Sequence, residues 1–228
     1  VNHIKNVLRM KKGETILISD GEDREYVCTI DELENEQVRA KIEDVNGVAK
    51  ELPIKVTLFQ ALPKGDKMET VIQKMIELGA YEIVPVFTKR CIVKLDNKKA
   101  VSKTKRWNSI AESAAKQSKR GIIPKVSMPV TYKEALKMAE AMDMVLIPYE
   151  NAENMAHTRQ VVSQIKTDMT VGIFIGPEGG FAEEEVEQAI NTGAYDITLG
   201  KRILRTETAG FTCISLIQYE LGDLGGNI

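Results

Sequence analysis

Short apolar runs alternate with helical segments through most of the chain, and this alternation limits the possible folds more than any other feature. The apolar runs span residues 54–61, 82–87, 144–149, 171–176 and 196–200. Continuous apolar runs of this length are typical of strands in a parallel sheet that helices cover on both faces. The segment from Met68 to Ile76 instead repeats apolar residues at helical spacing and ends at Gly79. The sequence therefore predicts an α/β domain with a mostly parallel sheet over residues 54–228.

Residues 1–53 have a different pattern, and we expect them to form a separate β domain. Apolar residues at Val38, Ala40 and Ile42 alternate with polar ones, as in a strand with one buried face. We expect strands over residues 13–19, 25–30 and 37–45. The pairs Asp20-Gly21 and Asn46-Gly47 supply turn residues beside these strands.

Helix signals fill the gaps between the apolar runs of the second domain. We expect helices over residues 102–118, 131–141 and 206–221, and another that starts near Ala182. Trp107 is in phase with the other apolar residues of its helix, which predicts a core position. Asp66 and Glu69 have the spacing of a capping box. The last helix is apolar almost all round, so we expect it to be buried within the domain or against a second subunit.

Positive charge is concentrated in the middle of the chain, although the whole protein has a net charge of −2. Residues 61–130 carry a net charge of +9, whereas residues 1–60 carry −3 and residues 131–228 carry −8. A basic segment of this size can present a phosphate-binding face. A solvated lysine-rich surface has the same composition, so charge alone leaves both interpretations open.

Cysteine and histidine usage argues against disulfide and metal frameworks. The three cysteines are far apart in the sequence and odd in number, which indicates reduced thiols in the cytoplasm. His3 and His157 have no cysteine partners at ligand spacing, so we expect no metal site. Since neither a membrane-spanning apolar run nor a signal peptide stands out, we expect a cytoplasmic protein without a membrane partner.

A glycine-rich loop with the sequence GPEGGF, residues 176–181, follows one predicted strand directly. Three glycines and a proline specify a tight loop whose backbone can approach a ligand closely. In α/β sheets, ligands bind outside the carboxyl ends of the strands, where this loop falls. It is not a P-loop, because no Gly-Lys-Ser/Thr sequence follows. From the residues alone, a ligand loop and a structural turn both remain open.

A second loop, with the sequence LGKRILRTETA over residues 199–209, also follows a strand and leads into a helix. Thr206 and Thr208 can cap free backbone donors there. Lys201, Arg202 and Arg205 concentrate positive charge beside apolar neighbours. A plain basic lead-in to the helix explains these residues less well than a ligand loop does.

Together, these two segments resemble the signature pair of the RsmE family, the 16S rRNA uridine-N3 methyltransferases. Other parts of the chain are similar to the same family, namely His3-Ile4 with Val7-Leu8-Arg9, the sequence LPKGDKME at 62–69, and the helix with Arg106-Trp107, Gln117-Ser118 and Arg120. The resemblance covers nearly all 228 residues. Family members usually carry another strand before the His3 element, and many have proline where Lys201 stands.

The resemblance implies a PUA-like RNA-binding β-barrel over residues 1–53, lacking its first strand, and a trefoil-knotted α/β domain of the SPOUT type over residues 54–228. It also implies a homodimer that uses S-adenosylmethionine. By position, the residues that bind the cofactor are Pro148, Tyr149, Glu150, Ile175, Gly176, Pro177, Glu178, Gly179, Gly180, Leu199, Gly200, Ile203, Leu204, Thr206 and Thr208.

The implied reaction places a methyl group on the N3 atom of a uracil, and it suggests roles for three charged residues. N3 loses a proton, and negative charge spreads onto O2 and O4, so a nearby cation is expected to stabilise the transition state. Arg205 is the first candidate for this cation, and Arg9 is the second. Glu207 is a candidate general base, although an acidic residue in the first turn of a helix also compensates the helix dipole.

The implied partner is 16S rRNA within the 30S subunit, and the basic middle of the chain is its expected contact surface. The candidate RNA-binding residues are Arg9, Lys64, Lys67, Lys89, Arg90, Arg106, Gln117 and Arg120. Arg106, Gln117 and Arg120 share one face of the predicted helix.

Two other functions compete with this interpretation. A SPOUT enzyme that methylates another RNA base or a ribose hydroxyl would share the cofactor loops. A non-catalytic RNA-binding assembly factor is expected to have degraded loops, and both loops are intact in this sequence. The KGD element at 64–66 and the tryptophan helix favour the uridine methyltransferase.

Overall fold

The computed structural model describes residues 1–21, 24–47, 51–152 and 154–224, and the chain divides into two compact units. The N-terminal unit consists of residues 1–51 and 119–123. The α/β unit consists of residues 52–118 and 124–228. No sequence pattern predicted that residues 119–123 leave the α/β unit to join the N-terminal one.

The N-terminal unit is built on a three-stranded antiparallel sheet in the order β1-β2-β3. Its elements are η1 (His3–Val7), β1 (Thr15–Ser19), β2 (Arg24–Leu33) and β3 (Val38–Gly47). All three strands lie where the alternation predicted them. The predicted turn at Asn46-Gly47 is wrong, because both residues continue β3 and pair with Glu25 and Arg24 of β2.

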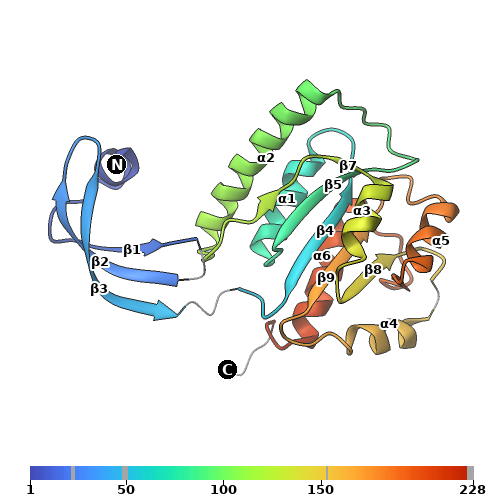
Figure 1. Ribbon diagram of the computed structural model, residues 1–228. Coiled ribbons are helices and arrows are strands. Elements are labelled where there is room, and N and C mark those ends of the chain that lie inside the picture. Colours follow the sequence, from blue (N-terminus) through green and yellow to red (C-terminus); the bar gives the residue numbers. More distant parts are fainter. Residues whose placement is uncertain (22–23, 48–50, 153, 225–228) are drawn as a thin grey trace. The chain divides into compact units, whose positions relative to one another are not determined.

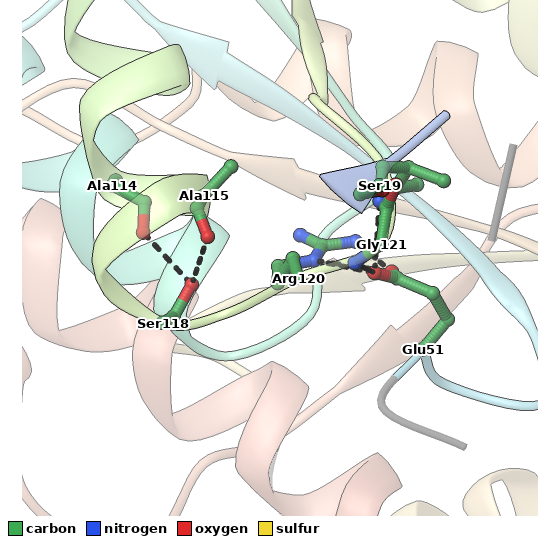
Figure 2. A network of polar contacts seen from close by, with 8 residues as sticks. Ser19, Glu51, Ala114, Ala115, Ser118, Arg120 and Gly121 are labelled. Atoms are coloured by element: carbon green, nitrogen blue, oxygen red, sulfur yellow. Dashed lines mark hydrogen bonds and ion pairs between the residues drawn. The ribbon is translucent and has the colours of Figure 1, made fainter. Parts of the chain in front are cut away.

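The segment 119–123 is held to the rest of the N-terminal unit through the Glu51 carboxylate (Figure 2). Arg120 Nε donates to both Glu51 oxygens, at 3.2 and 3.1 Å, and the backbone N–H of Gly121 donates to Oε1 at 3.1 Å. Ser19 Oγ donates to the Gly121 carbonyl at 2.7 Å. The Arg120 side chain is only 4% exposed. Arg120 is thus an internal ion-pair partner, which corrects its prediction as a phosphate contact.

The α/β unit contains a seven-stranded sheet in the order β10-β8-β9-β4-β5-β6, with β7 also paired to β5 (Figure 1). Its strands are β4 (Lys55–Ala61), β5 (Glu82–Phe87), β6 (Lys125–Val126), β7 (Val130–Thr131), β8 (Met144–Pro148), β9 (Thr170–Ile175) and β10 (Tyr195–Ile197). Its helices are α1 (Lys67–Glu77), α2 (Asn97–Gln117), α3 (Tyr132–Ala139), α4 (Met155–Val162), α5 (Glu183–Asn191) and α6 (Thr206–Glu220). Every pairing in this sheet is parallel, which confirms the predicted parallel sheet.

The sheet is covered on both faces, as its continuous apolar strands predicted. In β9, Ile173 packs into one core, which includes residues of α1, α2, α4 and α6. The next residue, Phe174, packs into a second core with residues of α3 and α5 and stacks on Phe59 at 4.4 Å between ring centroids. Trp107 is buried in the first core, which confirms its predicted role.

Helix boundaries differ from the predictions where local side-chain bonds decide them. The predicted capping box at Asp66 is wrong, because its backbone has a ψ of 10° and its side chain makes no cap bond. Helix α2 begins five residues before the predicted start, where Asp96 accepts a hydrogen bond from the Lys99 backbone N–H at 2.8 Å. The predicted burial of α6 holds for Cys213 and Ile217, whereas Tyr219 is 74% exposed.

Candidate functional site

Three loops at one edge of the sheet enclose a cavity of about 600 Å³. They follow β8, β9 and β10, which are neighbours in the sheet, so their carboxyl ends bring the loops together. The lining residues are Lys67, Pro148, Tyr149, Glu150, Ile175, Gly176, Pro177, Glu178, Gly179, Gly180, Phe181, Thr198, Leu199, Gly200, Lys201, Arg202, Ile203, Leu204, Arg205, Thr206 and Ala209. A cavity of this size, with apolar walls and several polar groups, is typical of a small-molecule site.

Fourteen of the fifteen residues predicted to bind a cofactor line this cavity, and Thr208 is the exception. Thr206 and Thr208 are two residues apart at the start of α6, so they lie on different sides of the helix. Thr206 is buried and Thr208 is exposed. The other fourteen lie at the cavity and remain predicted cofactor contacts.

The geometry of the loops favours glycine at two positions. A Cβ atom on Gly176 would lie 3.1 Å from backbone atoms of Gly180 and Phe181, which is tighter than an ordinary contact, so the loop would have to open slightly to accept another residue. Gly200 has a φ of 105°, a left-handed conformation that side chains disfavour.

The segment that leads into α1 and the segment after β5 hold the glycine-rich loop in place. Glu178 accepts hydrogen bonds from the Lys64 backbone N–H at 3.0 Å and from Lys67 Nζ at 3.1 Å. Arg90 donates to the Gly179 carbonyl at 2.8 Å. These three basic residues were predicted to bind RNA phosphates. In the structure, the Lys67 and Arg90 side chains and the Lys64 backbone contact the loop.

The same contacts set the ionisation of Glu178. Partial burial acts to raise the pKa of this carboxyl group, but hydrogen bonds from its own backbone N–H, from Lys67 and from the Lys64 backbone N–H outweigh burial. The pKa of Glu178 therefore lies below its ordinary value of 4.5.

This lowered pKa predicts a pH-dependent contribution of Glu178 to stability. The contribution is fully present above the ordinary pKa and is lost as the pH falls through the lowered, folded-state pKa. We expect Glu178→Gln to lower the Tm at neutral pH, with the difference from the natural protein shrinking below about pH 4. Differential scanning fluorimetry across the pH range measures this difference. A Tm difference that stays constant down to about pH 3 contradicts the assignment. Glu187→Gln, at an exposed position of α5, is the control.

A buried carboxylate anchors the far end of the glycine-rich loop, and sequence reasoning missed it. Glu185 is 5% exposed and accepts hydrogen bonds from the backbone N–H groups of Lys89, at 2.7 Å, and Ala182, at 2.9 Å. The Tyr132 hydroxyl donates to the Glu185 carbonyl at 2.6 Å. The Lys89 side chain pairs with Glu184. Glu185 is one of three acidic residues in the first turn of α5, and the sequence alone distinguishes none of them from the others as more than compensation of the helix dipole.

Of the three predicted catalytic residues, Arg205 and Glu207 lie at the start of α6 in the α/β unit, and Arg9 belongs to the N-terminal unit. Arg205 is exposed and lines the cavity at the N-terminus of α6. Glu207 does not line it, and its Oε2 atom is buried, 3.7 Å from Lys67 Nζ, with no hydrogen-bond partner among the described residues. Arg9 is exposed in the N-terminal unit and has a φ of 54°.

The remaining predicted RNA contacts lie on α2. Arg106 is exposed and pairs with Glu69 at 2.8 Å, and Gln117 is exposed at the last residue of the helix. Within the part of the chain that the structure describes, no three His, Cys, Asp or Glu side chains are grouped to hold a metal ion. No described helix is long and apolar enough to cross a membrane.

Known proteins with this sequence pattern are RNA methyltransferases. A family model for the RNA methyltransferase domain matches residues 50–218, and one for the RNA methyltransferase PUA domain matches residues 1–43. The ribosomal RNA small subunit methyltransferase E of Bacillus subtilis is 36% identical over 230 residues, covering all of this chain and 90% of the relative. The chain belongs to the ribosomal RNA small subunit methyltransferase E family.

Solved structures of the family agree with this assignment. The ribosomal RNA small subunit methyltransferase E of Neisseria gonorrhoeae, bound to S-adenosylmethionine, is 34% identical with a TM-score of 0.81, covering 96% of this chain and 88% of that one. A Legionella pneumophila methyltransferase with bound S-adenosylmethionine is 36% identical with the same TM-score and the same coverage. The predicted PUA-like domain and SPOUT α/β fold are thus confirmed, and the trefoil knot stays a prediction.

Proposed function

We propose that this protein transfers a methyl group from S-adenosylmethionine to the N3 atom of a uridine in 16S rRNA. The observation that carries the proposal is the cavity formed by the loops after β8, β9 and β10. Family membership supports it, as do the two relatives of at least 34% identity that were solved with S-adenosylmethionine bound.

The cavity suits S-adenosylmethionine in size and in chemistry. Its volume of about 600 Å³ lies in the range of small-molecule sites. Ile175, Leu199 and Leu204 supply apolar walls that suit an adenine ring, and glycine backbone atoms can approach the ligand closely. The cavity lining carries two carboxylates, Glu150 and Glu178, and four cations, Lys67, Lys201, Arg202 and Arg205, so it can pair with both the positive and the negative groups of S-adenosylmethionine.

The proposed chemistry requires this chain to orient a uracil and to manage one proton. S-adenosylmethionine supplies an activated methyl group, so the main protein contribution is alignment of the reacting atoms. Arg205 lines the cavity and stabilises negative charge on the uracil oxygens as N3 loses its proton. Glu207 is the proposed acceptor of that proton, a role that requires its carboxylate to turn from Lys67 toward the cavity. Arg9 of the N-terminal unit is proposed as a second stabilising cation.

The proposed substrate is an unpaired or flipped uridine, because a base pair hides the N3 atom. Lys64, Lys89, Arg106 and Gln117 are proposed contacts to the RNA backbone, with Lys67 and Arg90 serving both the loop and the RNA. The assembled 30S subunit is the proposed form of the substrate. This reaction places the protein in the cytoplasm.

We also propose a homodimer with a trefoil-knotted α/β unit. The exposed side chain of Tyr219 on α6 supports the dimer, because large apolar groups of a mostly apolar helix are commonly covered in an assembly. Sedimentation of the protein at micromolar concentration tests this assembly: a dimer is expected, and a monomer contradicts it.

Transfer of a labelled methyl group tests the proposed function. Unmodified 30S subunits and protein-free 16S rRNA are each incubated with the protein and methyl-labelled S-adenosylmethionine, and the label in 16S rRNA is counted. We expect more label in the 16S rRNA of the assembled subunit than in protein-free 16S rRNA. Label in neither substrate, from a protein that binds S-adenosylmethionine, contradicts the proposal and favours a non-catalytic assembly factor.

A further inference from the structure

Gln60 is a buried polar residue in a strand whose other side chains are mainly apolar. It lies in β4 next to Phe59 and pairs in register with Ile175 at the end of β9. Its exposed fraction is 0%, and it does not line the cavity. Burying an amide side chain is unfavourable unless hydrogen bonds replace those to water, so the contacts of Gln60 need an explanation.

Those contacts join the two loops of the cavity. Gln60 Nε2 donates to Thr206 Oγ1 at 2.8 Å and to the Ala61 carbonyl at 2.9 Å. Thr206 Oγ1 in turn donates to the Gly176 carbonyl at 2.6 Å. Gly176 begins the glycine-rich loop, and Thr206 is the first residue of α6, directly after the loop that follows β10. The sheet thus connects to both loops through one chain of hydrogen bonds.

The chemistry of the donors fixes the direction of this chain. Thr206 has one hydroxyl proton, and the Gly176 carbonyl can only accept it, so Thr206 Oγ1 must accept from Gln60. The Ala61 carbonyl also only accepts, so both contacts require the amide nitrogen of Gln60. The opposite amide orientation would place an oxygen against two acceptors and is therefore excluded.

The Gln60 contacts come at a cost to stability. Its Oε1 atom is buried and has no hydrogen-bond partner in the described structure. An unpartnered buried acceptor is destabilising, and an apolar residue of similar size would avoid it. A role in stability alone therefore does not account for a glutamine at this position.

We infer that Gln60 is a positioning residue for the methyl donor. It acts through Thr206 and Gly176, both of which line the cavity, and it fixes the separation of the two loops between which the donor binds. This inference rests on the proposed use of S-adenosylmethionine. It predicts that Gln60 controls donor affinity without contacting the donor or the RNA.

The test compares S-adenosylmethionine binding by Gln60→Leu and by a matched control, Gln218→Leu. Gln218 is also a buried glutamine, at 5% exposure, with its Nε2 bonded to Asp223 and its Oε1 unpartnered. It does not line the cavity. We expect Gln60→Leu to raise the Kd about tenfold and Gln218→Leu to leave it unchanged. The KM for 30S subunits and the kcat at saturating donor should remain those of the natural protein.

Thr206, the next residue in this series of hydrogen bonds, gives an independent test that does not depend on how well Gln60→Leu folds. Thr206→Val removes the hydroxyl and should weaken donor binding, whereas Thr206→Ser keeps it and should bind normally. A double variant that combines Gln60→Leu with Thr206→Val should bind S-adenosylmethionine no more weakly than Thr206→Val alone, because both changes break the same series of hydrogen bonds. Additive losses, or natural affinity in Gln60→Leu, would overturn the inference. If the natural protein itself does not bind S-adenosylmethionine, the proposed function is refuted instead.

Discussion

Replacing Gly200 with tryptophan should abolish binding of S-adenosylmethionine. Gly200 lines the cavity, and a Cβ atom built on it meets no atom within 4 Å, so an indole ring would occupy space needed by the donor. Its φ of 105° adds backbone strain to any side chain, which further displaces the loop. Isothermal titration should show a Kd raised by at least about a hundredfold.

Backbone strain alone could weaken a protein, and Gly193→Trp controls for that effect. Gly193 has a φ of 96° and equally open space around its Cβ position, but it follows α5 and does not line the cavity. We expect Gly193→Trp to lower the Tm while leaving the donor Kd close to that of the natural protein. Equal loss of binding in both variants would attribute the loss to backbone strain, and natural affinity in Gly200→Trp would contradict the assignment of the cavity as the donor site.

Arg205→Ala should give the second large effect, a loss of about 10²- to 10³-fold in the rate constant for methyl transfer. Arg205 is the predicted catalytic cation that lines the cavity, and removing it leaves negative charge on the uracil uncompensated. Donor affinity should change little, because the charge develops only during the reaction. Single-turnover assays with saturating 30S subunits and donor measure this rate constant.

A phosphate contact at Arg205 would behave differently from a catalytic cation. Loss of a phosphate contact raises the KM for RNA and makes binding less dependent on salt, with little effect on the saturated rate. Arg159→Ala removes the same charge from an exposed position of α4 outside the cavity, and it should keep the natural rate. A raised KM with an unchanged saturated rate in Arg205→Ala would contradict the catalytic role.

The cavity loops were predictable from sequence because each directly follows a strand. Continuous apolar runs located β8 and β9, and the carboxyl ends of parallel strands carry ligand loops whatever the order of the strands. The neighbour relations β10-β8-β9-β4 were not predictable, because crossover connections leave no local signal in the sequence. For the same reason, the link from Gln60 to Thr206, which are 146 residues apart, could not be anticipated.

The wrong prediction of Arg120 as an RNA contact has a local physical cause. Arg120 was assigned to the face of α2 by extending helical spacing, but the helix ends at Gln117 and Lys119 has a left-handed φ of 56°. Arg120 then pairs with Glu51 instead of facing solvent. Lys67 and Arg90 remain predicted RNA contacts. Their contacts to the glycine-rich loop depend on strand neighbours that the sequence does not specify.

The identity of the methylated nucleoside tests the central claim most directly. Unmodified 30S subunits are treated with the protein and S-adenosylmethionine, and the 16S rRNA is digested to nucleosides that are separated and identified by mass spectrometry. The proposed mechanism predicts 3-methyluridine, formed at one uridine, and about 10²- to 10³-fold more slowly when Arg205→Ala replaces the natural protein. A methyl group on the ribose or on any other base atom would contradict the assignment to uridine N3.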